Sequence, residues 1–556
     1  MGEAWVVNAE PPGDATVHTF ASPLLHARRN FADRTALVCG DKRFTYAEMA
    51  DRCSRLAGAL YAMGLQPGDR VAVLSANSHQ NVEAWAGLPA AGLVVVPLNT
   101  RHAEPELLYA LEDSGAKVLL TDRDPGALAG VVDRVVSMPE DYEALLAQGD
   151  EATLGAHIDE DTLAGLFYTG GTTGASKGVM LSHRGIIANS LHWLALVNHQ
   201  PDDRFMVMAP LFHAAGSLQV IPMIWTGGSQ VMLPVFDPAA ALDMIEAEQI
   251  TMTLGVPTML AAIAEEQHDR PRRTETLRAI GHGGSPIATG IIRRFHAGLP
   301  TAEMIEIYGA TELSPLATGL RHEETLVDDP RATSCGQAFP GVDVRVCTKP
   351  ANPSGPANPS GPASPSGPAD PSGPANPSEP ASAGEPAVEC APGTVGEVVV
   401  RGPTVMQGYW NKPEQTAEVV VDGAYWTGDL GYMDEAGYLF LVDRSKDMIV
   451  SGGENVYSTE VEEVLYQHPA VLEAAVFGVP DDKWGEAVQA VVVPREGEPE
   501  PTPEALIAFC RERIGGYKVP KAIELRHEPL PKSGPGKVLK RELRAPYWEG
   551  RERQVG

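Results

Sequence analysis

The sequence is poor in cysteine, and its few cysteines are widely spaced. Six occur in 556 residues, at Cys39, Cys53, Cys335, Cys347, Cys390 and Cys510. None stands in a C-x-x-C pattern, so the sequence predicts neither a zinc site nor a disulfide framework. Scattered cysteines of this kind are typical of a reducing compartment, and we therefore expect a cytoplasmic protein.

Long apolar runs are missing as well. The longest weakly polar run, Ala84–Leu98, contains Pro89 and Pro97 and is shorter than the roughly 20 residues that a membrane helix requires. The segment Met1–Glu10 has no basic stretch followed by an apolar core. We therefore expect neither a signal peptide nor an integral membrane segment.

Positive charge is also scarce. With 43 Lys and Arg residues against 73 Asp and Glu residues, the formal net charge is −30. Nucleic acids and anionic membranes are polyanions, so this charge argues against either as the main partner. Small anionic ligands remain compatible with it, because they need only a local group of positive charges.

The chain is too long for one compact core, so we expect two or more domains. In the first half, a helical pattern over Phe44–Met63 with a capping residue at Thr45 precedes strand-like segments at Arg70–Leu74 and Gly92–Pro97. This alternation predicts a mostly parallel α/β sheet covered by helices. After Asp443 the pattern changes to a small α+β unit of roughly a hundred residues, a size that folds as a separate domain.

A proline repeat interrupts the second half. Residues 351–380 are five copies of a six-residue unit with proline at every third position. This spacing excludes a helix or a central strand and predicts a solvated, extended insertion. The flanking strand-like segments Val342–Val346 and Gly396–Arg401 would form a hairpin, so the insertion lengthens a surface loop. A protein-docking role for the repeat is the alternative.

The segment Tyr168–Gly178 is dense in glycine and hydroxyl groups. It has the sequence Y-T-G-G-T-T-G-A-S-K-G and follows the apolar, strand-like run Leu163–Phe167. Glycines let backbone N–H groups turn toward a bound anion, and Lys177 adds positive charge. The segment predicts a loop that holds a polyphosphate; a flexible surface loop is the alternative. It is not a Walker A loop, because the chain has no G-x-x-x-x-G-K-[ST].

Three further motifs contain groups suited to a nucleotide. Tyr308–Leu313 (Y-G-A-T-E-L) follows a strand-like segment, and ligands bind at the carboxyl ends of strands in open α/β sheets. Tyr425–Leu430 (Y-W-T-G-D-L) offers a carboxylate for ribose hydroxyls. Leu530–Arg541 contains P-K-S-G-P-G-K. Taken singly, these motifs are also typical of a helix start, a turn and a solvated basic tail.

Together, and in this order, the four motifs resemble those of the adenylate-forming superfamily, which comprises acyl-CoA synthetases, luciferases and peptide-synthetase adenylation domains. The resemblance covers residues 20–345 and 393–545. The chain departs from the common loop Y-T-S-G-T-T-G-x-P-K-G at Gly170 and Ser176. Its Gly-Gly variant, followed by V-M-L-S-H, is similar to the fatty acyl-CoA ligase branch.

The resemblance implies two domains. Residues 1–443 would form a large N-terminal α/β domain of the adenylate-forming type, with 351–380 as a disordered insertion. Residues 444–556 would form a small mobile C-terminal α+β domain, with the hinge at Lys446.

The resemblance also assigns the nucleotide site. The implied ATP-binding residues are Thr169, Gly170, Gly171, Thr172, Thr173, Gly174, Lys177, Gly283, Gly284, Ser285, Glu306, Tyr308, Thr311, Asp429 and Arg444. The implied catalytic residues are Lys537, Thr311, Glu312 and Lys177. Thr311 would contact the α-phosphate, Glu312 would bind Mg²⁺, and Lys537 would relieve the negative charge that builds up when a carboxylate attacks phosphorus.

The remaining implied sites bind the acid and the thiol. The acyl pocket would contain His213, Ala214, Gly216 and Gly283, and CoA would contact Gly452, Gly453, Trp484, Tyr517 and Lys518. Amino-acid-activating domains carry an aspartate at the place of His213, so we expect a fatty or aryl acid instead. A packed core histidine is the alternative for His213. The usual proline of the segment after Gly453 is replaced here by Ser458.

The implied function is that of an ATP-dependent acyl-CoA synthetase. It would activate a carboxylic acid, medium- or long-chain fatty or aryl, as an acyl-adenylate and pass it to CoA, using ATP, Mg²⁺ and CoA. One alternative is an adenylating enzyme with another acceptor, such as a carrier-protein thiol or an amine. The other alternative is a non-catalytic homologue. The sequence does not decide whether the chain forms a homodimer.

Overall fold

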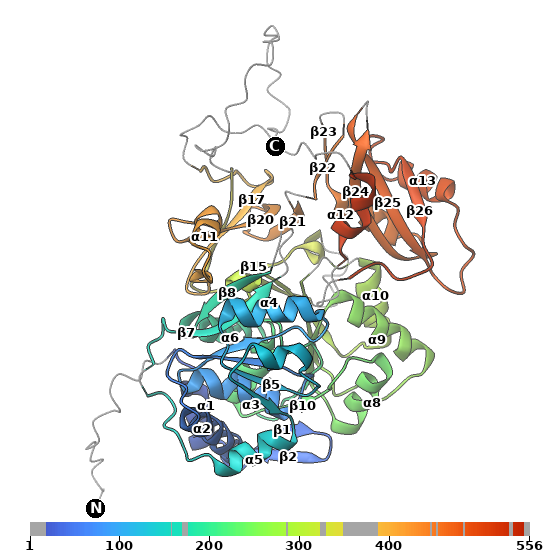
Figure 1. Cartoon of the computed structure of the whole chain (residues 1–556). Helices are drawn as coiled ribbons and strands as arrows, with labels where there is room; N and C mark the ends of the chain where they lie inside the picture. The colour runs from blue at the N-terminus through green and yellow to red at the C-terminus, as the bar shows by residue number, and fades with distance from the viewer. Residues whose placement is uncertain are drawn as a thin grey trace, which may run out of the picture.

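The computed structural model describes residues 18–156, 158–169, 176–284, 287, 289–322, 330–348, 387–444, 447–451, 454–481, 484–532 and 538–549. The proline repeat 351–380 lies outside these described residues. Within them the chain forms two large mixed sheets with covering helices, a smaller antiparallel sheet, and a C-terminal α+β unit (Figure 1).

The first large sheet is parallel in its interior. Its strand order is β15-β14-β13-β12-β11-β9-β10-β1-β2. The strands span β1 (Thr35–Cys39), β2 (Lys42–Thr45), β9 (Arg204–Val207), β10 (Ser229–Met232), β11 (Met252–Gly255), β12 (Ala279–Gly283), β13 (Glu303–Tyr308), β14 (Thr318–His322) and β15 (Gln337–Ala338). Only the pairings that involve β2, β14 and β15 are antiparallel within the described sheet.

The second large sheet has the order β18-β8-β7-β4-β3-β5-β6. Its strands are β3 (Arg70–Leu74), β4 (Val94–Pro97), β5 (Val118–Thr121), β6 (Arg134–Ser137), β7 (Leu163–Thr169), β8 (Lys177–Ser182) and β18 (Gly408–Tyr409). The strands from β7 to β6 are parallel, and β8 and β18 add antiparallel pairs. The expected mostly parallel sheet is thus confirmed for the interior of both sheets.

Helices separate and cover these sheets. They span α1 (Ala21–Asn30), α2 (Tyr46–Ala62), α3 (His79–Ala90), α4 (Glu104–Ser114), α5 (Glu140–Gln148), α6 (His183–Leu196), α7 (Gly216–Thr226), α8 (Pro238–Glu248), α9 (Pro257–Asp269) and α10 (Thr289–Gly298). Thr45 begins α2 with a complete capping box, since its hydroxyl accepts from Glu48 N and the Glu48 carboxylate accepts from Thr45 N. The predicted cap is confirmed, while Phe44 belongs to β2 rather than to the helix.

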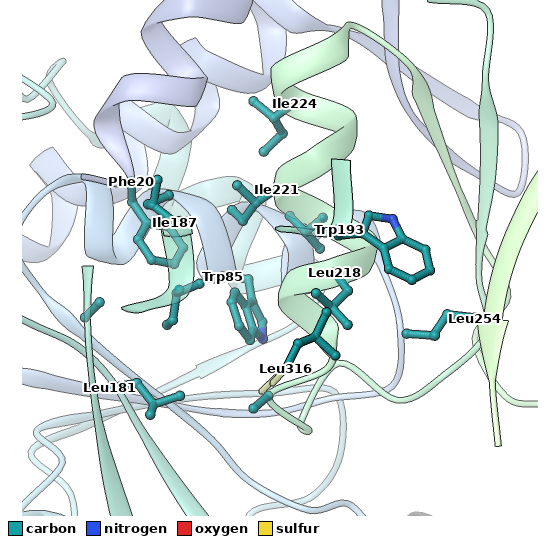
Figure 2. Packing of buried hydrophobic residues seen from close by; sticks show 14 of the residues in the cluster. Phe20, Trp85, Leu181, Ile187, Trp193, Leu218, Ile221, Ile224, Leu254 and Leu316 are labelled. Atoms are coloured by element: carbon teal, nitrogen blue, oxygen red, sulfur yellow. The ribbon is translucent and has the colours of Figure 1, made fainter. Parts of the chain in front are cut away.

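The largest core cluster lies between the two sheets. Figure 2 shows Trp85 of α3 near Leu218 and Ile221 of α7, with Trp193 of α6 farther along the same layer. Every residue of α3 is buried, which explains why the sequence from 84 to 98 is apolar without spanning a membrane. The indole Nε1 of Trp85 donates to the carbonyl of Leu211 at 2.8 Å, so this core also fixes the backbone beside the predicted acyl pocket.

A smaller antiparallel sheet follows. It contains β16 (Asp343–Cys347), β17 (Gly396–Arg401), β19 (Val420–Val421), β20 (Ala424–Met433) and β21 (Leu439–Arg444), next to α11 (Pro413–Val419). Strands β16 and β17 pair antiparallel from Asp343↔Arg401 to Cys347↔Glu397. The hairpin predicted around the proline insertion is confirmed.

The C-terminal part is a separate α+β layer with its own core (Figure 1). Its elements are β22 (Ile449–Ser451), β23 (Glu454–Val456), α12 (Ser458–Tyr466), β24 (Val471–Asp481), β25 (Gly485–Pro494), α13 (Pro503–Arg511), β26 (Ala522–Leu525) and α14 (Lys540–Arg544). The fold class is therefore the predicted one, a large N-terminal α/β body and a small C-terminal α+β body. Among the described residues, no helix has the length and apolarity needed to cross a membrane.

Candidate active site

Several predicted site residues lie outside the described residues. They are Gly170, Gly171, Thr172, Thr173, Gly174, Ser285, Lys446, Gly452, Gly453 and Lys537. The predicted phosphate loop is nevertheless bracketed by described residues at both ends. Thr169 ends β7 and Lys177 begins β8, and the two are directly paired across the antiparallel hairpin. Both residues therefore belong to the strands that hold the loop rather than to the loop itself.

Lys177 and Glu312 meet at the ring of Tyr409. The ammonium nitrogen of Lys177 lies 4.6 Å from the centroid of this ring, and the Tyr409 hydroxyl donates to Glu312 Oε1 at 2.9 Å. Burial, followed by the charge of Glu312, raises the pKa of the Tyr409 hydroxyl, so the phenol stays a donor at neutral pH. Tyr409 was not predicted as a site residue; it lies in β18, which pairs with β8.

Thr311 and Glu312 lie just beyond the carboxyl end of β13, in the short 3-10 turn Thr311–Leu313. The backbone carbonyl of Glu312 accepts a hydrogen bond from Met406 N at 2.8 Å. The Thr-Glu pair therefore sits at a strand end, as the sequence predicts, and in a turn rather than at the start of a long helix.

A second group of side chains joins the first large sheet to the smaller antiparallel sheet. The Tyr308 hydroxyl donates to Asp429 Oδ2 at 2.9 Å. Asp429 Oδ1 lies 3.1 Å from Arg444 Nε, and the two residues pair directly across β20 and β21. Asp429 is only 7% exposed, and these two contacts fix the orientation of its carboxylate.

Glu306 has a partner that the sequence did not suggest. Its Oε2 lies 2.7 Å from His282 Nδ1, and the two residues are aligned across the parallel pair β12 and β13. His282 is fully buried. Next to it, a Cβ at Gly283 would lie 2.2 Å from the carbonyl of Ile307, and Gly284 has φ +81°. Glycine is therefore required at both predicted positions for the backbone to turn past β13.

Three of the residues predicted for the acyl pocket, His213, Ala214 and Gly216, lie in the turn after β9 and at the start of α7. Asn77 accepts from Leu211 N at 3.0 Å and donates to Ala209 O at 3.1 Å. His213 and Ala214 are held in the following turn, and a Cβ at Gly216 would lie 3.1 Å from Leu211 O. Asn77 was not predicted, because it lies more than a hundred residues from Leu211 in the chain.

His213 is half-buried, with its Nε2 withdrawn from solvent, and is uncharged at neutral pH. Burial, then the positive charges of Arg101 and His102, lowers its pKa to about 4. Its ring lies 4.4 Å from that of Phe212, and its Nε2 has no hydrogen-bond partner among the described residues. A buried polar atom without a partner is costly, so this nitrogen offers a hydrogen bond to a ligand or water beside it.

Of the residues predicted to bind CoA, Trp484, Tyr517 and Lys518 are described, and all three belong to the C-terminal unit. Trp484 and Tyr517 are 41% and 44% exposed, and the ammonium of Lys521 lies 5.9 Å from the Trp484 ring centroid. Lys518 donates to both carboxylate oxygens of Glu460, at 2.6 and 2.8 Å. Lys518 is thus already paired, and its ammonium also lies 5.5 Å from the centroid of the Tyr517 ring.

The donor set at Glu312 suits Mg²⁺. The described residues contain no group of three or more His, Cys, Asp or Glu side chains arranged to hold a metal ion. Mg²⁺ is usually bound by one or two carboxylates together with phosphate oxygens. The single oriented carboxylate of Glu312, with phosphate oxygens as the other ligands, therefore fits this ion better than a site built from protein ligands alone would.

Comparisons with known proteins agree with this arrangement. A family model described as AMP-binding enzyme matches residues 24–362, and one described as AMP-binding enzyme C-terminal domain matches residues 460–537. The chain is 39% identical to a feruloyl-CoA synthase from Amycolatopsis sp over 92% of this chain and 95% of the relative.

Two other relatives are named for different activities. The chain is 33% identical to the fatty acid–[acyl-carrier-protein] ligase ScoC of Streptomyces coeruleorubidus, over 94% of this chain and 95% of that protein. It is 33% identical to a long-chain-fatty-acid–CoA ligase of Bacillus subtilis, over 94% of each chain.

Solved structures with a similar fold agree with these sequence matches. The ATP-bound crystal structure of MatB from Rhodopseudomonas palustris superposes with a TM-score of 0.82 at 30% identity, covering 95% of this chain and 99% of that one. The family model alone spans more than half of the chain. The chain therefore belongs to the AMP-binding enzyme family, in the acyl-CoA synthetase branch of the adenylate-forming superfamily, a branch of AMP-forming acid–thiol ligases that use ATP, Mg²⁺ and CoA.

Proposed function

We propose that this chain forms an aryl acyl-adenylate from ATP and a carboxylic acid and transfers the acyl group to CoA. The observation that carries the acid class is the half-buried, uncharged His213, whose buried Nε2 has no partner among the described residues and whose ring lies beside that of Phe212. A flat aromatic wall and one polar atom suit a rigid ring that carries a polar substituent. The similarity to feruloyl-CoA synthase supports the same class.

The nucleotide would contact both groups of side chains described above, the one around Tyr409 and the one around Asp429. Asp429, oriented by Tyr308 and Arg444, would accept the ribose hydroxyls. Lys177 and Thr311 would face the phosphates, and Glu312 would hold Mg²⁺. When bound, this ion would neutralise phosphate charge.

In the first step, a carboxylate oxygen of the acid would attack the α-phosphorus of ATP. The new P–O bond would form as the bond to the pyrophosphate oxygen breaks. Both reactants are anions, so the positive charges of Lys177 and Lys537 would stabilise the charge that develops on phosphorus. Because His213 is neutral, it would add no charge beside the acid. It would contact the ring or chain of the acid.

In the second step, the CoA thiolate would attack the acyl carbon, and AMP would leave. The exposed rings of Trp484 and Tyr517 support a binding surface for CoA on the C-terminal unit. Gly452 and Gly453 would let the pantetheine arm approach the backbone closely. Rotation at Lys446 would bring this surface to the adenylate after pyrophosphate has left.

A fatty acid is the second candidate substrate. The Gly170-Gly171 variant of the loop and the similarity to a long-chain-fatty-acid–CoA ligase favour it. A carrier-protein acceptor is favoured by the similarity to ScoC.

A competition experiment separates these candidates. The purified chain would receive ATP, Mg²⁺ and CoA with equal concentrations of ferulate, phenylacetate, decanoate and palmitate, and products would be identified by mass spectrometry. We expect ferulate or phenylacetate to be converted with the highest kcat/KM. Preferred conversion of decanoate or palmitate would replace the aryl assignment by the fatty one. AMP and pyrophosphate without any thioester would mean that the acceptor is not CoA.

A further inference from the structure

Asp113 accepts hydrogen bonds from two segments that lie far from it in the chain. It is the last residue but one of α4, and its side chain is 15% exposed. The hydroxyl of Tyr168, in β7, donates to Asp113 Oδ2 at 2.7 Å, and the ammonium of Lys412 donates to Asp113 Oδ1 at 3.3 Å. The indole Nε1 of Trp410 donates to the backbone carbonyl of Asp113 at 3.0 Å. One residue of α4 therefore holds both β7 and the segment that follows β18.

Tyr168 connects Asp113 to the strand on which Lys177 lies. It pairs directly with Gly178 across β7 and β8, and a Cβ at Gly178 would lie 3.2 Å from the Tyr168 ring. Burial, followed by the bond to Asp113, raises the pKa of the Tyr168 hydroxyl, so the phenol stays a donor at neutral pH. The bond thus fixes a ring that lies against the residue next to Lys177.

The segment after β18 connects Asp113 to Tyr409. The backbone N–H of Trp410 donates to Gly178 O at 2.8 Å, and the backbone N–H of Lys412 donates to Tyr409 O at 3.1 Å. The two side chains that reach Asp113 therefore come from residues that directly flank Tyr409 or bond to its carbonyl.

The charge of Asp113 matters because Lys412 is largely withdrawn from solvent. The Lys412 side chain is 20% exposed, and its ammonium also donates to the Tyr109 hydroxyl at 3.1 Å. An ammonium withdrawn from solvent is costly without its carboxylate. An uncharged side chain at position 113 therefore favours a Lys412 side chain that turns out to solvent, which leaves the segment after β18 less firmly placed.

Both connections lead to the proposed nucleotide site. The ring of Tyr409 lies 4.6 Å from the Lys177 ammonium, and its hydroxyl donates to Glu312 Oε1 at 2.9 Å. Asp113 therefore reaches Lys177 by two routes, one through Tyr168 and β8 and the other through Tyr409. It reaches Glu312 by the second route.

We propose that Asp113 is a positioning residue for the binding of MgATP, in which it acts by holding Tyr168 and Lys412. This role rests on the proposed function, in particular on Lys177 facing the phosphates and Glu312 holding Mg²⁺. Because Asp113 acts on these two residues through others, its loss weakens the binding of MgATP and leaves the rate at saturation nearly unchanged.

The test uses Asp113→Asn, which keeps the shape of the side chain and removes its charge, and Lys412→Met, which removes the ammonium. The double variant combines the two. Binding of α,β-methylene-ATP with Mg²⁺ is measured by titration calorimetry, and KM for ATP and kcat are measured with CoA and ferulate or decanoate. Glu524→Gln is the matched control, because Glu524 also accepts from a tyrosine hydroxyl, that of Tyr547 at 3.0 Å, but belongs to the C-terminal unit.

We expect Asp113→Asn to weaken binding of the analogue and to raise KM for ATP about tenfold, with kcat within about twofold of the wild type. Lys412→Met should weaken binding several-fold. Because Lys412 acts through the same carboxylate, the double variant should bind the analogue no more weakly than Asp113→Asn alone. Glu524→Gln should change none of these values.

Three results would overturn the proposal: unchanged binding in Asp113→Asn, a loss of kcat with KM for ATP unchanged, or additive losses in the double variant. Should Asp113→Asn not fold, Lys412→Met decides, and unchanged binding in that variant overturns the proposal. If the wild type does not bind the analogue at all, the proposed function itself is refuted.

Discussion

The phenol of Tyr308 donates a hydrogen bond of 2.9 Å to the carboxylate of Asp429. This bond joins β13 of the parallel sheet to β20 of the antiparallel sheet, two strands that are more than a hundred residues apart in the chain. It leaves the Asp429 carboxylate with one fixed orientation, in which the Arg444 side chain occupies its other oxygen. The proposed ribose site is thus assembled from strands of two different sheets.

Tyr308→Phe tests whether this bond orients the ribose acceptor. Since a hydrogen bond to a charged group contributes about 1.5–3 kcal/mol, we expect KM for ATP to rise tenfold or more with little change in kcat. Tyr432→Phe is the control, because Tyr432 stacks on Phe440 in the same antiparallel sheet without touching Asp429. An unchanged KM for ATP in Tyr308→Phe would refute this role for Tyr308.

Tyr409→Phe tests the link between Lys177 and Glu312. The substitution keeps the ring beside Lys177 and removes the hydroxyl that donates to Glu312. Loss of a residue that orients a metal ligand typically weakens metal affinity ten- to a hundredfold. We therefore expect the Mg²⁺ concentration for half-maximal pyrophosphate exchange to rise about tenfold. If the Mg²⁺ titration of the variant matches that of the wild type, the hydroxyl of Tyr409 is not needed to orient Glu312 for Mg²⁺.

His213 gives the protein a dependence on pH that can be measured. Its pKa in the folded chain is about 4, below the ordinary value of 6.5, because burial and then Arg101 and His102 oppose its protonation. Between these pH values the unfolded chain binds the proton and the folded chain does not, so stability is full above pH 6.5 and is lost as pH falls toward 4.

The loss attributable to His213 should be on the order of 2–3 kcal/mol. We expect His213→Gln to show a shallower fall in urea-unfolding free energy between pH 6.5 and 4 than the wild type does. Equal slopes in the two proteins would mean that His213 takes up its proton without cost in the folded state.

Deleting residues 351–380 tests whether the proline repeat is only a long loop. The strands around it are closed by bonds outside the repeat, since Thr348 N donates to Val388 O at 2.9 Å and Val388 N donates to Thr348 Oγ1 at 3.2 Å. We expect kcat and the melting temperature of the deletion variant to match those of the full chain. A glycine-serine segment of equal length serves as control, and a large loss of kcat in both variants would assign the repeat a role in catalysis.

Local signals in the sequence predicted much of the fold. The start of α2 was predictable because the capping residue Thr45 and its partner Glu48 lie only three residues apart in the chain. The hairpin β16–β17 was predictable because both strands are short, apolar runs that flank a segment unable to fold. Of the described motif residues, Lys177 begins β8 and Glu312 follows the end of β13, whereas Asp429 lies within β20.

The contacts that orient these residues were not predictable. Tyr409 reaches Glu312 from β18, Asn77 holds Leu211 from the preceding half of the domain, and His282 meets Glu306 only because β12 and β13 are neighbours. Each of these pairs depends on strand order, which one sequence does not specify. The substitution at Ser458 was visible, but its partners Asp443 and Lys540 became apparent only in three dimensions.

The most direct test of the account compares the wild type with Lys537→Ala in both half-reactions. Each protein would receive an aryl acid, ATP and Mg²⁺, and separately synthetic acyl-adenylate and CoA, with AMP, pyrophosphate and acyl-CoA measured together. The account predicts that the wild type forms acyl-CoA and AMP in equal amounts. It predicts that Lys537→Ala loses about a hundredfold or more in adenylate formation and retains thioester formation from the adenylate. Acyl-CoA formation without AMP, or full adenylation by the variant, would contradict it.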